Sequence, residues 1–354
     1  MQLETLIVGQ GIAGTTLALQ MEEKGKDYAI IDNNHNKSSS LVAAGLYNPV
    51  VFRKPSLSFN AHSVIPYLKT FYEKWETKLE TKFHQNRNII KLFTSVEDIN
   101  NWEVKSHNEQ LKAFLSKELL PPDFNSNLHC DMGAGKTMQS GNVYVSEFLN
   151  ATKTYFNSKL LQGEVLNIRK TQSGFTCLTS GGEIKSDRVI LSTGHINGPQ
   201  FEYLPLNGTK GDILTIYCSE IEGMDIINKG FFIMPLGDGF HRVGATFEWD
   251  NLGYQISEKA RVELNGKLKS VLKCDFKIED QHTGLRPTVG DRRPLLGEHP
   301  DITDLYLFNG LGSKGIMLAP YYSEQLVNHI FDNQLLEKEV DIKRYMKHYG
   351  NTKN

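Results

Sequence analysis

Residues 6–32 constrain the fold of this chain more than any other stretch. A hydrophobic strand, a glycine-rich turn, a helix and a second strand ending in Asp32 follow one another, and the turn has the pattern G-x-G-x-x-G. Gly9 permits the tight turn, Gly11 lets the backbone approach a pyrophosphate, and Gly14 lets the helix pack against the strand. Asp32 stands where a ribose-hydroxyl acceptor belongs, and the helix start favours phosphate. The segment therefore predicts dinucleotide binding rather than a glycine-rich turn without a ligand.

The composition is that of a globular chain and argues against several partners. The 354 residues carry a formal net charge of −2, and 39% of them are hydrophobic. This balance disfavours a dedicated nucleic-acid binder, and no apolar run reaches transmembrane length, so we expect no stable membrane insertion. The glycine motif begins too close to Met1 for a signal peptide, which predicts a cytoplasmic protein. Histidines and cysteines lack metal-ligand spacings, so we expect no metal.

Hydrophobic periodicity predicts a mixed chain of helices and strands. We expect helices at residues 63–79, 95–102, 146–159, 257–273 and 317–331. We expect strands at residues 164–169, 174–179, 183–186, 188–191 and 305–308, and a β-rich stretch over 211–248. Residues 104–127 look less regular. The sequence G-A-G-K-T at 133–137 resembles a P-loop, but Cys130 stands where that motif needs its first glycine, so we reject a P-loop here.

Beyond the glycine motif the chain departs from the pattern of a nicotinamide dehydrogenase, in which βαβ units follow in regular succession. Four later segments, in chain order, resemble the D-amino-acid oxidase superfamily of FAD enzymes, which includes glycine and sarcosine oxidases. They are S-S-L-V-A-A-G at 39–45, P-L-G-D-G through G-A-T-F-E at 235–248, G-L-R-P-T at 284–288, and G-L-G-S-K-G-I at 310–316. Residues 45–49 and 310–315 also resemble the oxidase domain of the bifunctional tRNA wobble-uridine modification enzyme.

The resemblance implies an α/β fold in which a Rossmann-like FAD-binding domain is interleaved with an antiparallel-sheet substrate domain. It assigns residues 1–80, 140–210 and 285–354 to the FAD domain, and 81–139 and 211–284 to the substrate domain. Because no cysteine occupies a flavin-attachment motif, we expect non-covalent FAD. The residues expected to contact FAD are Gly9, Gly11, Ile12, Ala13, Gly14, Asp32, Asn33, Ser40, Ala43, Ala44, Gly45, Val165, Thr193, Gly194, Gly312, Ser313, Lys314, Gly315 and Ile316.

The chemistry of this family places two demands on the protein, because a hydride leaves the carbon beside an amine and reaches the flavin. A substrate carboxylate needs a fixed cation, and the resemblance gives that role to Arg286, whose guanidinium can bind it bidentately. A structural salt bridge is the alternative for Arg286. The reduced flavin needs positive potential, which residues 312–316 and Lys314 would supply unless that lysine faces solvent. Tyr47 is expected either to line the substrate side or to pack in the core.

Three functions remain open on the sequence. In the first, the chain oxidises a small amino acid or an N-substituted glycine and passes the electrons to O₂ or another acceptor. Alternatively, it acts on a carboxymethylaminomethyl wobble uridine in tRNA, which its slightly acidic balance disfavours. In the third alternative it binds FAD without turnover, as a subunit of a heteromeric amine dehydrogenase.

Overall fold

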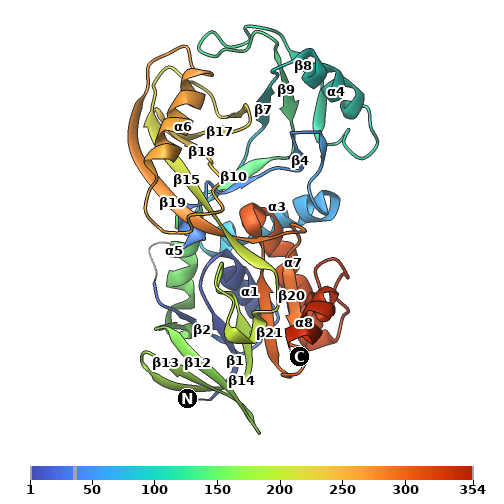
Figure 1. Ribbon diagram of the computed structural model, residues 1–354, viewed down its shortest axis with the longest axis vertical. Coiled ribbons are helices and arrows are strands. Elements are labelled where there is room, and N and C mark those ends of the chain that lie inside the picture. Colours follow the sequence, from blue (N-terminus) through green and yellow to red (C-terminus); the bar gives the residue numbers. More distant parts are fainter. Residues whose placement is uncertain (1, 35–37, 353–354) are drawn as a thin grey trace.

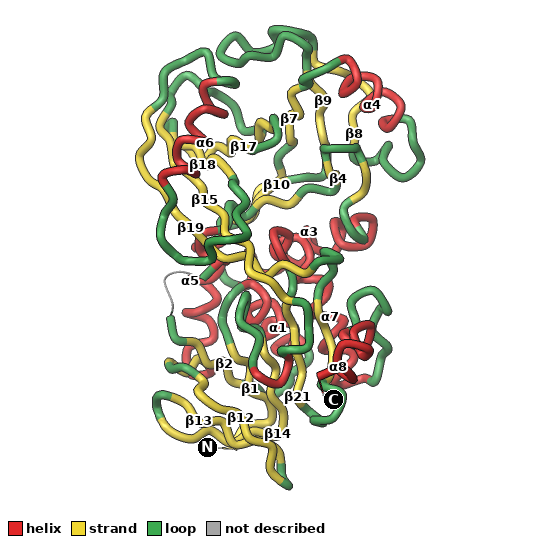
Figure 2. The backbone as a smooth tube through the Cα atoms, in the orientation of Figure 1, coloured by secondary structure: helices red, strands yellow, loops and turns green. Residues whose placement is uncertain are grey.

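A computed structural model describes residues 2–34 and 38–352, which form two lobes (Figure 1). Both chain ends lie in the lower lobe, and the long strands β15 (Leu206–Tyr217) and β19 (Lys277–Val289) run from the upper lobe toward the lower one. Each lobe is built around one large sheet, as the strand colouring of Figure 2 shows.

The lower lobe contains a sheet of eight strands. Its members are β1 (Gln2–Val8), β2 (Ala29–Asp32), β11 (Leu160–Gln162), β12 (Val165–Thr171), β13 (Gly174–Thr179), β14 (Gly182–Leu191), β20 (Leu295–Glu298) and β21 (Leu305–Asn309). Strands β11, β2, β1, β14 and β21 are parallel neighbours in that order. Helix α1 (Ile12–Glu23) crosses from β1 to β2 with residues 12–21 all buried, which is the arrangement expected of a parallel sheet covered by helices.

The upper lobe is built on a second eight-stranded sheet, in the order β19, β15, β18, β17, β16, β7, β9, β8. Besides β15 and β19 it contains β7 (Ile89–Leu92), β8 (Leu115–Leu120), β9 (Ala134–Thr137), β16 (Ile226–Asn228), β17 (Phe232–Gly237) and β18 (Phe240–Gly244). Two small sheets complete the strands: β3 (Leu46–Tyr47), β6 (His84–Asn86) and β10 (Gly141–Val143) form one, and β4 (Val50–Val51) and β5 (Ser56–Leu57) form the other.

The remaining helices cover the sheets and join the lobes. They are α2 (Ser39–Val42), α3 (Ala61–Lys78), α4 (Val96–Ser106), α5 (Val145–Phe156), α6 (Glu258–Lys269), α7 (Gly315–Asp332) and α8 (Met346–Thr352). Short 3₁₀ turns lie at Asn157–Lys159, Pro199–Phe201, Gly312–Lys314 and Ile342–Tyr345. Among the described residues, no helix is long and apolar enough to cross a membrane.

The helices expected from periodicity are present with small shifts at their ends, whereas several strands were missed or divided, and the longest of the described strands, β19, was not expected from the sequence. Residues 183–186 and 188–191 are one strand, β14, because its first half pairs with β13 and its second half with β1 and β21. Residues 104–127 contain β8, which sequence analysis missed. The P-loop-like stretch forms β9, where a Cβ on Gly135 would overlap the ring of Trp102. That glycine serves packing.

The α/β class is therefore confirmed, with a Rossmann-like parallel sheet and a second, mainly antiparallel one. The first sheet draws on residues 2–32, 160–191 and 295–309, and the second on 89–137 and 206–289. The domain limits expected from the sequence stay a prediction.

Candidate FAD and substrate site

The glycine-rich turn between β1 and α1 leaves no room for side chains at its first and last glycines. Gly9 has a φ of +103°, and a Cβ on it would lie 2.6 Å from the carbonyl oxygen of Ser192. A Cβ on Gly14 would overlap the carbonyl oxygen of Gly9. The helix begins after Gly11, which has no side chain to cap it. The turn thus has the shape that brings backbone N–H groups close to a phosphate.

Asp32 and Ser40 hold this turn in place. The Asp32 carboxylate accepts the backbone N–H groups of Gln10 and Asn34, each at 2.7 Å. Ser40 Oγ accepts the backbone N–H of Ile12 at 3.0 Å. A carboxylate has about four acceptor positions, so Asp32 keeps capacity for ribose hydroxyls at the end of β2.

Two further segments expected at the cofactor lie against the ends of β1 and β2. The backbone N–H of Ser192 donates to the carbonyl of Val8 at 2.9 Å, which places residues 193–194 beside the end of β1. The N–H of Gly163 donates to the carbonyl of Asp32 at 3.0 Å, so β12 begins with Val165 close to the acid. Asn33 is exposed beside Asp32.

The residues expected near the flavin ring also converge, although they come from distant parts of the chain. Residues 43–45 connect α2 to β3, and Gly45 has a φ of +76° with its Cα close enough to Val143 that a Cβ would overlap that carbonyl. Residues 312–316 form a 3₁₀ turn and the start of α7. A Cβ on Gly315 would lie 3.1 Å from a methyl group of Ile12, so α1 and α7 begin side by side.

Arg286 lies within β19 and is half-buried. Its Nη1 donates to the carbonyl of Thr246 at 3.2 Å, and its guanidinium stacks on the ring of Phe247 at 4.4 Å. A Cβ on Gly211 would overlap the guanidinium, so glycine is required beneath it. Burial lowers the pKa of Arg286 to about 10, and the Asp212 carboxylate opposes this shift. No carboxylate oxygen of the described residues lies within 4.0 Å of the guanidinium, so Arg286 is not a salt-bridge residue in this structure.

The face of β19 that carries Arg286 meets the segments expected at the flavin. Gly284 lies two residues earlier on the same face, and a Cβ there would be 3.2 Å from the Cβ of Val42 in α2. The carbonyl of Pro287 is the nearest neighbour of a Cβ on Gly312. Arg286, residues 43–45 and residues 312–316 therefore belong to one region.

Lys314 does not face solvent. It is half-buried, and its Nζ donates to Ser58 Oγ at 3.0 Å. Burial, together with the charges of Arg293 and Arg292, lowers the pKa of Lys314 to about 8. Its neighbour Ser313 is exposed. The lysine thus brings a partly buried positive charge to the start of α7.

Tyr47 packs in the core. Only 1% of its surface is exposed, and its hydroxyl lies 2.9 Å from His84 Nε2 and donates to Asn86 Oδ1 at 3.0 Å. It does not line the cavities described below. A catalytic role for Tyr47 stays a prediction from sequence. The position of its side chain is that of a core residue.

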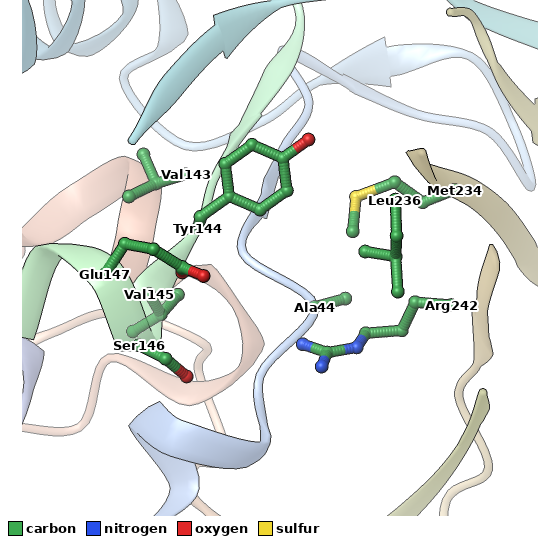
Figure 3. A pocket seen from close by; sticks show the side chains of 9 residues that line it. All are labelled: Ala44, Val143, Tyr144, Val145, Ser146, Glu147, Met234, Leu236 and Arg242. Atoms are coloured by element: carbon green, nitrogen blue, oxygen red, sulfur yellow. The ribbon is translucent and has the colours of Figure 1, made fainter. Parts of the chain in front are cut away.

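A cavity of about 210 Å³ opens beside Ala44, between β17, β18 and the start of α5 (Figure 3). Tyr144, Glu147, Met234, Leu236 and Arg242 line it with Ala44. Sequence analysis missed all of these except Ala44. The alternation of Met234 and Leu236 along one strand is a signal that these two share a face, but it does not say which face meets the cofactor.

Comparison with known proteins decides the family. The model of the DAO family, described as FAD dependent oxidoreductase, matches residues 4–328. The chain belongs to this family. A glycine oxidase of Bacillus licheniformis is 25% identical, with 96% of this chain and 95% of that protein covered. The tRNA 5-methylaminomethyl-2-thiouridine biosynthesis bifunctional protein of Marinobacter nauticus is 21% identical, covering 92% of this chain and 55% of that protein.

Among solved structures, iminodiacetate oxidase from Chelativorans sp. BNC1 has the same fold as this DAO-family chain. The TM-score is 0.80 at 20% identity, with 97% of this chain and 98% of that chain covered. Family membership makes the chain an FAD-dependent oxidoreductase, as the sequence motifs indicated. A glycine oxidase of Bacillus subtilis is also similar, at 21% identity with 96% of this chain covered and 94% of that protein.

The residues present fit the flavin cofactor of the family. Side-chain atoms at Gly9, Gly14 or Gly45 would collide with backbone carbonyls, so the chain preserves a cradle of bare backbone. Asp32, at one end of this cradle, suits a ribose, and residues 312–316, at the other, suit the negatively charged edge of a reduced ring. The described residues contain no group of three His, Cys, Asp or Glu side chains suited to a metal ion.

Proposed function

We propose that this chain oxidises the C–N bond of a small amino acid or an N-substituted glycine in the cytoplasm, with non-covalently bound FAD. Arg286 carries the proposal, because its guanidinium has no ion-pair partner among the described residues and shares a region with residues 43–45 and 312–316. The relatives named glycine oxidase and iminodiacetate oxidase support this substrate class. The electrons pass to O₂ or another acceptor.

Arg286 orients the substrate. A guanidinium binds a carboxylate through two parallel hydrogen bonds, and the stacked ring of Phe247 keeps the guanidinium plane fixed. Holding the carboxylate in one position fixes the adjacent carbon as well, which removes much of the entropic cost of the reaction. Bound FAD supplies the hydride acceptor, and the imine product then hydrolyses in water.

The start of α7 supplies positive potential. Its first N–H groups carry the partial positive charge of the helix dipole, and the ammonium of Lys314 lies in the same turn. Both favour the negative charge that accumulates on a flavin when it is reduced.

Two substitutions of Arg286 test the proposal. Arg286→Met should lower kcat/KM for a carboxylated amine about 100-fold or more, since one partner of a buried charge pair is lost. Arg286→Lys should fall between, because an ammonium lacks the bidentate fork. Arg188→Met is the control. Arg188 is also a half-buried arginine, but it lies in β14 of the lower lobe and pairs with Asp304. Full activity of Arg286→Met on carboxylated amines would show that the site is misplaced.

The comparisons give no support to tRNA as a partner, and no structural observation favours it over a small substrate. Nucleoside analysis of a deletion strain separates the two, because a changed wobble-uridine profile would favour tRNA. A flavin that no amine reduces would favour the non-catalytic subunit.

A further inference from the structure

The guanidinium of Arg242 lines the cavity beside Ala44, and the proposed reaction gives this positive charge no role. Arg242, in β18, donates from Nη1 to the carbonyl of Ala43 at 3.2 Å. Its Nε is buried and has no hydrogen-bond partner among the described residues. Figure 3 shows the guanidinium beside Ala44, with the Glu147 carboxylate on the opposite wall of the cavity.

This arrangement is unfavourable unless an anion enters. Burial lowers the pKa of Arg242, and the negative charge of Glu147 opposes that shift. No carboxylate oxygen of the described residues comes within 4.0 Å of the Arg242 guanidinium. A partly buried charge with an unsatisfied N–H group costs free energy that a bound carboxylate or phosphate would recover.

Arg242 lies on the same sheet face as Arg286. Arg286 pairs with Thr209 of β15, and Arg242 pairs with Thr215 of the same strand, six residues away. Residues directly opposite one another in a sheet share a face, and so do residues an even number apart. Both guanidinium groups therefore extend toward the α2 side, which Gly284 and the carbonyl of Ala43 also mark.

The register also sets their separation. The Arg286 guanidinium lies over Gly211, four residues along β15 from Thr215. Four residues span about 13 Å along a strand, and β18 lies one strand spacing, about 5 Å, from β15. The two cations are therefore on the order of 10 Å apart.

We propose that Arg242 binds a second anionic group, carried on the N-substituent of the substrate. The substrate class is then an N-(carboxyalkyl)glycine whose two carboxylates lie about 10 Å apart, one on Arg286 and one on Arg242. Met234 and Leu236 line the same cavity as Arg242 and contact the end of the N-substituent that carries the second carboxylate. This inference rests on the proposed amine oxidation, and adds to it a specificity for a doubly charged, extended substrate.

A neighbouring cavity leaves space for such a substituent. It has a volume of about 450 Å³ and shares Tyr144 and Leu236 with the cavity that Arg242 lines. The Tyr144 hydroxyl is held in place, because Arg87 donates to it at 2.9 Å. An N-substituent that is longer than needed to reach Arg242 can therefore extend past Tyr144 into this second cavity.

A matched pair of substrates tests the inference on the holoenzyme. N-(5-carboxypentyl)glycine carries the second carboxylate, and N-hexylglycine has a methyl group in its place. We expect kcat/KM to favour the dicarboxylate by about tenfold to a hundredfold, the effect of a charge-assisted hydrogen bond. In Arg242→Met this ratio should fall to near one. In Glu147→Gln it should rise a few-fold, and this variant removes only an exposed charge.

The outcomes separate this inference from the proposed function. If Arg242→Met and Glu147→Gln both keep the wild-type ratio, Arg242 does not bind the second anion. If none of glycine, sarcosine, N-hexylglycine and N-(5-carboxypentyl)glycine reduces the flavin, the proposed oxidation is wrong. Binding is then measured with azelate, a dicarboxylate without an amine, through the flavin absorbance. Equal azelate affinity in wild type and Arg242→Met overturns the inference, whereas affinity that falls tenfold supports it.

Discussion

Three residues, Arg286, Arg242 and Lys314, bring positive charge to the region where the two sheets meet, and they differ in how sequence reveals them. Arg286 is marked by the G-x-R-P segment, and its place beside the cofactor segments follows the resemblance. Arg242 sits in a strand without a motif, so only the register of β18 shows which face it occupies.

Tyr47 and its neighbour Leu46 show how differently two adjacent strand residues can be placed. Neighbouring residues in a strand point to opposite faces. Leu46 packs toward the cluster that contains Met234, whereas Tyr47 points into the core and bonds to Asn86. The sequence pair Leu-Tyr carries no sign of which member faces the site, because both are apolar enough for either place.

The burial of Lys314 gives a pH-dependent stability. Its pKa of about 8 lies below the unfolded value of 10.5, so the unfolded chain binds more protons between these two values. The penalty is complete below about pH 8 and disappears as the pH rises toward 10.5. In the apoprotein, Lys314→Met should therefore be more stable than wild type at pH 7 by about 1–3 kcal/mol. Urea unfolding should show this advantage shrinking by pH 10, and a difference independent of pH would contradict it.

At the scale of elements, the chain's strongest local signal was also the most reliable. The β1-turn-α1-β2 unit matches expectation because glycines, apolar periodicity and the acid agree there. β8 was not predicted from the sequence, because its exposed face is polar and because Pro121 and Pro122 follow it. The union of two expected strands into β14 was also beyond local sequence, since its pairing partners come from distant segments.

Two helix glycines give a matched test of the turn. Gly14→Ala places a Cβ on the carbonyl of Gly9, whereas a Cβ on Gly266 in α6 would meet nothing within 4 Å. Gly14→Ala should destabilise the protein by about 1–3 kcal/mol or more and weaken FAD binding. Gly266→Ala should stabilise it by about 0.5–1 kcal/mol. Chemical denaturation measures both, and equal effects of the two substitutions would show that the turn is not as closely packed as described.

At the scale of the whole molecule, the residues expected to contact FAD come from stretches far apart in the chain, and the second sheet adds Arg286; these stretches are 9–14, 32–33, 40–45, 165, 193–194 and 312–316. A ligand that contacts all of them stabilises only the folded chain. Adding FAD to apoprotein at about 100 times its Kd should raise the free energy of unfolding by about 2.7 kcal/mol. Denaturation followed by ultrafiltration should release the flavin if the link is non-covalent. Flavin that stays with the denatured chain would contradict non-covalent binding.

The central claim is that FAD bound to this chain takes a hydride from the carbon beside the nitrogen of a carboxylated amine. An anaerobic absorbance titration of the purified holoenzyme with glycine, sarcosine and longer N-substituted glycines tests it most directly. We expect a yellow protein whose visible flavin absorbance is bleached by at least one of these amines and returns when an electron acceptor is admitted. A bound flavin that keeps its full absorbance throughout the series would contradict the claim.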